Sequence, residues 1–108
     1  MTFQYATLRI ICKPIDDFHQ YLMNTLIIST FTCSFEDFER DVTGFIKGMG
    51  NEVVSEFQFV KVNDHKSHLL MNVTDMDALC TEMTSDKAKE WDKANNCEDT
   101  VYGIELVE

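Results

Sequence analysis

Arginine is scarce in this chain, and so is positive charge of any kind. Only Arg9 and Arg40 are arginines among the 108 residues, and 9 basic residues stand against 19 acidic ones, giving a formal net charge of −10. Arginine supplies the planar fork that makes paired contacts to guanine and phosphate, and an acidic surface repels phosphate groups. The composition therefore excludes nucleic acid and anionic membranes as expected partners.

Long apolar runs and secretion signals are also missing. No stretch approaches the ~20 apolar residues that cross a membrane. The first residues carry no basic start, and Arg9, Lys13, Asp16 and Asp17 interrupt any apolar core of a signal peptide. We therefore expect a cytoplasmic protein whose four cysteines stay reduced.

Signatures of metal sites and of known catalytic motifs are absent as well. No two cysteines stand at CxxC spacing, and the chain has no glycine-rich phosphate loop, no HExxH motif and no EF-hand spacing. On this basis we predict no metal site and no cofactor.

What remains has the composition of a globular domain, with 44% hydrophobic and 26% charged residues. From residue 25 onward, β-branched and aromatic runs predict strands, and apolar residues at three- and four-residue steps predict helices. Ser34, Thr74 and Ser85 each stand where a side chain can cap a helix. The predicted elements are a strand over Thr25–Cys33, a helix from Ser34 to Gly50, strands over Val53–Val62 and Ser67–Val73, two linked helices separated at Thr84-Ser85 and ending at Asn95, and a strand over Thr100–Val107.

This order of elements predicts a ferredoxin-like βαββαβ sandwich of the α+β class, with the helices on one face of a four-stranded antiparallel sheet. Neighbouring residues of a strand point to opposite faces, and the predicted strands are apolar at both sets of positions, as at Leu26, Ile27 and Ile28. The helices can cover only one face. We therefore expect the other face to form a homodimer.

Residues 1–24 are predicted to be an extension of the domain at residues 25–108. Phe3–Cys12 indicates a weak strand, and Pro14 can open a short helix. Because the six-element pattern is complete from Met23, we predict that a chain beginning there folds, and Met23 is an alternative natural start.

Two stretches and the element order resemble the dimeric α+β barrel superfamily. They are MDALCTEMTSDKAKEWDKANN at Met76–Asn96 and VYGIELVE at Val101–Glu108, and the resemblance covers residues 23–108. The superfamily includes antibiotic-biosynthesis monooxygenases, stress-responsive barrel proteins and small uncharacterised bacterial proteins. The resemblance implies a homodimer whose sheets pack face to face, with a pocket between each sheet and its helices. Heme-degrading members use a helical histidine, which this chain lacks in its two main helices.

Two functions remain open at this point. The first is a non-catalytic or ligand-binding homodimeric module for a small apolar molecule, which we favour because no nucleophile, base and orienting group occur together. The alternative is a cofactor-independent monooxygenase or isomerase acting on a small hydrophobic molecule. Trp91 shares a helical face with Ala88, which also suits an ordinary core residue. The expected lining of the pocket is Phe38, Phe57, Met71 and Trp91.

His68 and Asn95 are the candidate catalytic residues. A histidine titrates near neutral pH without any shift, and His68 is predicted on a rigid strand, which suits a general base. Asn95 lies on the second helical region and is the candidate polar contact. Cys33 is a weaker candidate, since Glu36 and Asp37 oppose the effect of the helix dipole on its pKa.

Overall fold

The computed structural model describes residues 3–11 and 23–107, and from β2 onward it has the predicted order of strands and helices. None of the helices in these two ranges is both long and apolar enough to cross a membrane. The elements are β1 (Phe3–Ile11), β2 (Thr25–Thr30), α1 (Phe35–Met49), β3 (Val54–Asn63), β4 (Lys66–Val73), α2 (Met76–Met83), α3 (Asp86–Asn95) and β5 (Glu98–Val107).

The five strands form one sheet in the order β1-β5-β2-β4-β3. Strand β2 is antiparallel to both β4 and β5, and β3 is antiparallel to β4, which is the arrangement of a ferredoxin-like α+β fold. Strand β1 adds an edge strand parallel to β5, from the pair Phe3 and Asp99 to the pair Ile11 and Val107. The predicted helix at Pro14 lies outside the described residues, and independent folding from Met23 stays a prediction.

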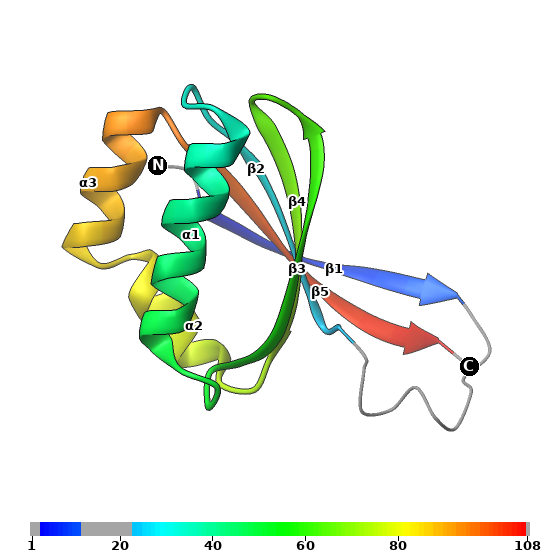
Figure 1. The fold of residues 1–108 in the computed structure, drawn as a ribbon. Helices are drawn as coiled ribbons and strands as arrows, with labels where there is room; N and C mark the ends of the chain where they lie inside the picture. The colour runs from blue at the N-terminus through cyan, green and yellow to red at the C-terminus, as the bar shows by residue number, and fades with distance from the viewer. Residues whose placement is uncertain (1–2, 12–22, 108) are drawn as a thin grey trace.

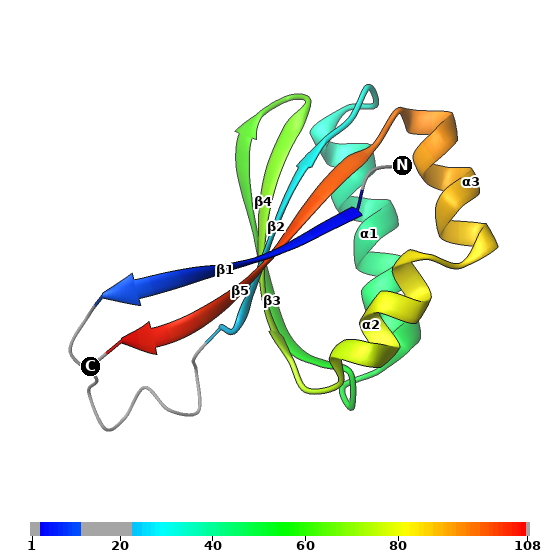
Figure 2. The same cartoon turned by 180° about the vertical axis from the view of Figure 1, so that it is seen from behind.

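All three helices cover the same face of the sheet (Figures 1 and 2). Ser34 and Ser85 cap α1 and α3 as predicted, each accepting a hydrogen bond from the amide three residues further on, at 3.1 and 3.2 Å. The predicted cap of α2 was wrong by one residue. Asp75 caps that helix, whereas the Thr74 hydroxyl donates to the Glu52 carbonyl.

Strand β4 shows which residues face the helices. Its burial alternates strictly, so that every second residue is buried under the helices and the residues between them are half-buried on the other side. The buried set is Ser67, Leu69, Met71 and Val73, and the other set is Lys66, His68, Leu70 and Asn72.

The face away from the helices is apolar at its centre, as the sequence predicted. Leu26 pairs with Leu70 on one side and with Tyr102 on the other, and all three are half-buried. On β3, Val60 and Val62 are 41% and 45% exposed. Among the described residues, no helix or strand packs over this side of the sheet (Figure 2). We call this surface the open face, and define it by Leu26, Ile28, Val60, Val62, Leu70, Tyr102 and Ile104.

Candidate functional site

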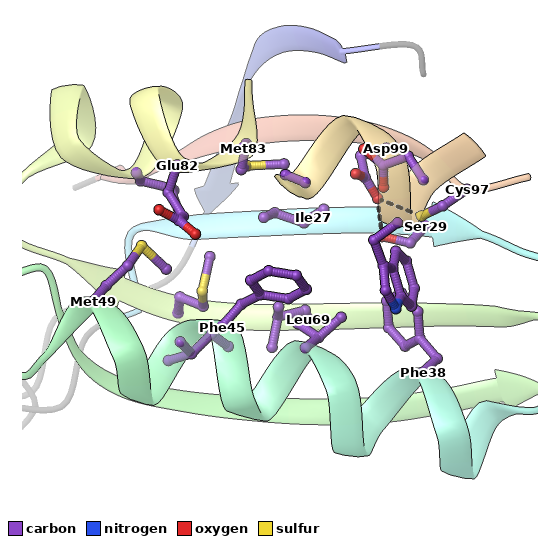
Figure 3. A pocket seen from close by; sticks show the side chains of 17 residues that line it. Ile27, Ser29, Phe38, Phe45, Met49, Leu69, Glu82, Met83, Cys97 and Asp99 are labelled. Carbon is purple, nitrogen blue, oxygen red and sulfur yellow. Dashed lines mark hydrogen bonds between the residues drawn. The ribbon is translucent and has the colours of Figure 1, made fainter. Parts of the chain in front are cut away.

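A cavity of about 80 Å³ lies between the sheet and the three helices (Figure 3). We call it the helix cavity. Most of its wall is apolar, and its polar groups are Ser29, Glu82, Asp92, Cys97 and Asp99. The apolar lining is Ile27, Phe38, Val42, Phe45, Ile46, Met49, Leu69, Met71, Leu79, Met83, Ala88 and Trp91.

Aromatic rings fix one part of this wall. The Phe38 ring stacks on Phe31 with centroids 4.0 Å apart, and it lies 5.9 Å from the Trp91 ring. The Trp91 indole Nε1 donates a hydrogen bond of 3.0 Å to the Asp41 carboxylate on α1. This bond joins α3 to α1 and orients the half-buried Trp91 ring, because an indole N–H removed from water needs an acceptor.

Buried polar groups meet at one end of the helix cavity. The Ser29 hydroxyl donates to Asp99 Oδ1 at 2.6 Å, and the Cys97 thiol donates to the same oxygen at 3.4 Å (Figure 3). Ser29 and Asp99 face each other across β2 and β5. Asp92, on α3, is buried beside them, and its Oδ2 has no hydrogen-bond partner among the described residues. We call Asp92, Cys97 and Asp99 the acidic cluster.

Burial sets the electrostatics of the acidic cluster. It raises the pKa of Asp92 from 3.8 to about 6, and the nearby Asp99 carboxylate adds to that rise. Burial also raises the pKa of Asp99, against the opposing effect of the Ser29 and Cys97 hydrogen bonds. The pKa of the Cys97 thiol is raised by burial and then by both carboxylates. The cluster therefore favours protons or another cation over free negative charge.

The helix cavity brings together three of the six residues that the sequence suggested. Phe38, Met71 and Trp91 line it, whereas Phe57 does not and instead contacts the Phe59 ring at 6.0 Å between centroids. Phe57 is therefore a core residue at the β3 edge of the sheet.

Neither candidate catalytic residue lines the helix cavity. His68 belongs to the half-buried set of β4 and points away from the helices, because strand neighbours alternate and Leu69 faces them. The Asn95 amide donates to the Trp91 carbonyl at 2.9 Å, and the Asn95 carbonyl accepts from Thr32, so Asn95 joins the end of α3 to the chain after β2. The structure therefore places both residues away from this cavity, and a catalytic role for either of them stays an untested prediction.

Cys33 has the environment of an unreactive thiol. Burial raises the pKa of Cys33, its backbone hydrogen bond lowers it, and Asp37 and Asp41 raise it further. A raised pKa leaves little thiolate at neutral pH, which agrees with the low rank that the sequence gave this residue.

The acidic cluster was missed at the sequence level. Asp99 and Val101 occupy alternate positions of β5, and Cys97 lies two residues before Asp99 in the turn that leads into the strand; all three are buried, so a carboxylate and a thiol precede Val101 on the core side. The predicted strand began at Thr100, two residues after the observed start at Glu98. Asp99 was therefore not assigned to a strand, and its alternation with Val101 was not considered. Extending the alternation back from Val101 is the signal that would have found it.

Comparisons with known proteins do not assign the chain to a family. No family model and no curated protein matches the chain. Among solved structures it is similar to SnoaB, described as a cofactor-independent oxygenase from Streptomyces nogalater. The TM-score is 0.49 at 11% sequence identity, and the match covers 74% of this chain and 91% of that chain.

Proposed function

We propose that this protein is a homodimeric module of the dimeric α+β barrel type that binds a small, largely apolar molecule. The helix cavity is the observation that carries the proposal. Ligand sites combine an apolar wall with a few convergent polar groups, and here those groups are Ser29 and the acidic cluster. A cavity of ~150 Å³ holds benzene, so one of about 80 Å³ suits a molecule smaller than benzene.

The same volume gives less support to the alternative, a cofactor-independent monooxygenase or isomerase. An aromatic substrate would need more space than the helix cavity offers. His68, the base that the sequence suggested, faces the other side of the sheet. Binding by Phe38, Met71 and Trp91 is thus better supported than turnover.

Binding of acetone to the nitrogen-15-labelled protein tests the cavity as a ligand site. This probe has four heavy atoms and is smaller than benzene, and ligands of that size reach about millimolar Kd values. Trp91 is the chain's single tryptophan, so its indole N–H gives one resolved NMR signal next to the cavity. We expect that signal to shift saturably as acetone is added.

A pair of alanines on α3 supplies the control. Ala88 lines the helix cavity and Ala94 is exposed. Ala88→Leu fills the cavity and is expected to weaken acetone binding at least tenfold, whereas Ala94→Leu leaves it unchanged. Equal binding by both variants, or a linear shift without saturation in the natural chain, would contradict a ligand site here.

A second copy of the chain is the proposed occupant of the open face. The centre of this face, around Leu26, Leu70 and Tyr102, is apolar and uncharged, whereas the chain as a whole has a net charge of −10. A stable interface buries about 800 Å² of each partner, which a sheet face of this kind can supply when two copies pack on each other. Two sheets packed in this way form the barrel that the resemblance implies.

Leu70→Glu tests the dimer, because it places a charge at the centre of the open face on both copies. Burying that carboxylate without a partner is costly, so we expect the dimer Kd to rise at least a hundredfold. Sedimentation equilibrium would give about twice the 12.5 kDa chain mass for the natural protein and one chain mass for the variant. Ala94→Glu, on the exposed side of α3, should remain dimeric. A natural protein that is monomeric at micromolar concentration would refute the proposal.

A further inference from the structure

We propose that the acidic cluster binds a divalent transition-metal ion of the Zn²⁺ class. Asp92, Cys97 and Asp99 each offer a ligand atom, and these atoms all lie within 4.8 Å of one another. The three residues are 5%, 3% and 8% exposed. They are brought together by the C-terminal half of α3, the turn that follows it and the start of β5. The inference does not depend on an apolar ligand in the helix cavity.

A buried, unpartnered oxygen of Asp92 is the independent observation that points to a ligand at this cluster. Its Oδ2 is fully buried and has no hydrogen-bond partner among the residues that the structure describes. A buried polar atom without a partner costs free energy, and native proteins almost always satisfy such atoms with a donor, a water or an ion. The Cys97 thiol donates to Asp99 and leaves Asp92 Oδ2 without a partner in the described part of the chain. A cation in the place of the thiol proton can contact both carboxylates at once.

The separation of two ligand atoms is close to that in a tetrahedral zinc site. Cys97 Sγ and Asp99 Oδ1 are 3.4 Å apart. In a tetrahedral zinc site, Zn–S and Zn–O lengths of ~2.3 and ~2.1 Å place sulfur and oxygen about 3.6 Å apart. A thiolate ligand also disfavours Mg²⁺ and Ca²⁺, which prefer oxygen. Binding transfers the thiol proton to solvent and puts the sulfur lone pair on the metal.

The surroundings supply what a metal site needs beyond its ligands. The Ser29 hydroxyl, 2.6 Å from Asp99 Oδ1, orients that carboxylate in the way that outer hydrogen bonds orient metal ligands. Asp92 and Cys97 also line an outer polar cleft of about 530 Å³ with Lys89, Lys93 and Glu98 among its walls, which gives an ion a route from solvent. Three protein ligands leave a fourth position, as in zinc sites that bind water or substrate.

Cd²⁺ titration of the reduced, chelator-treated full chain tests the site, because a Cd²⁺-bound thiolate has an ultraviolet charge-transfer band. We expect one equivalent to bind with that band. Cys97→Ser should abolish it, and Asp92→Asn and Asp99→Asn should each weaken affinity at least tenfold. Cys80→Ser and Glu90→Gln are the controls and should behave as the natural chain does. Cys80 is half-buried on α2, and Glu90 is exposed on α3.

Two results would overturn the proposal: no saturable band in the natural chain, or an unchanged band in Cys97→Ser. If the variants of the cluster fail to fold, two measurements on the natural chain test the site instead. X-ray absorption of its one-to-one Zn²⁺ complex should then find one sulfur with oxygen ligands at the zinc, and Zn²⁺ should raise the Tm because the assembled cluster binds it more tightly than the unfolded chain does. A zinc shell without sulfur, or a Tm that does not change, would refute the site.

Discussion

Replacing Phe38 by alanine is expected to lower the free energy of unfolding by about 3–5 kcal/mol, the range for truncating a buried phenylalanine. Phe38 is 2% exposed and is the ring on which this core is centred. It stacks on Phe31, meets the edge of Phe59 at 6.1 Å and lies 5.9 Å from Trp91. Alanine removes all three ring contacts and enlarges a cavity that is already present, so the loss combines transfer and cavity terms.

Urea unfolding followed by circular dichroism measures this loss, at one protein concentration because a dimer makes stability depend on concentration. Phe45→Ala is the matched control. Phe45 lines the same helix cavity but is half-buried, with a single ring contact to Trp91 at 6.4 Å. We expect it to cost about half as much. Losses of equal size in the two variants, or a loss below about 1.5 kcal/mol for Phe38→Ala, would show that the core is not centred on Phe38.

The element order could be predicted because it depends on local periodicity. Two local signals can be recognised without any long-range contact. They are the apolar steps of three and four residues in α1 and the serines that cap α1 and α3. The position of β1 could not be predicted in the same way. Its parallel pairing with β5 joins Phe3 to Asp99, and such a pairing leaves no mark in either strand alone.

Some cavity residues could likewise be predicted from local spacing, and others depend on packing between distant elements. Phe38 and Trp91 belong to helical stripes that must face the sheet, so their inward direction followed from spacing. The face on which His68 lies could not be predicted, because β4 is apolar on both faces: Leu69 and Leu70 are equally hydrophobic, and only the packing of the helices decides which one is inside. The acidic cluster was missed because the sequence rule places carboxylates at the surface, and the sites that break this rule are often functional.

The pH dependence of stability should report Asp92. In metal-free protein with a chelator present, Asp92→Asn is expected to raise the free energy of unfolding by about 2 kcal/mol at pH 7.5 and by almost nothing at pH 4. Burial raises the pKa of Asp92 from 3.8 to about 6, a change that corresponds to about 3 kcal/mol. Asparagine is neutral at every pH but keeps part of the cost of burying a polar group, which reduces the gain.

The direction in which stability changes with pH depends on whether the folded or the unfolded chain binds the Asp92 proton more tightly. The folded chain binds it more tightly at Asp92, so this group's contribution to stability is complete below pH 3.8 and is lost as pH rises through about 6. Thermal and urea unfolding between pH 4 and 8 should therefore show the two proteins diverging as pH rises. Glu90→Gln removes one charge from the exposed side of the same helix and should change stability little at any pH. A gain that is the same at pH 4 and pH 7.5 would mean that Asp92 is not buried as a carboxylate, because only ionisation makes its cost depend on pH.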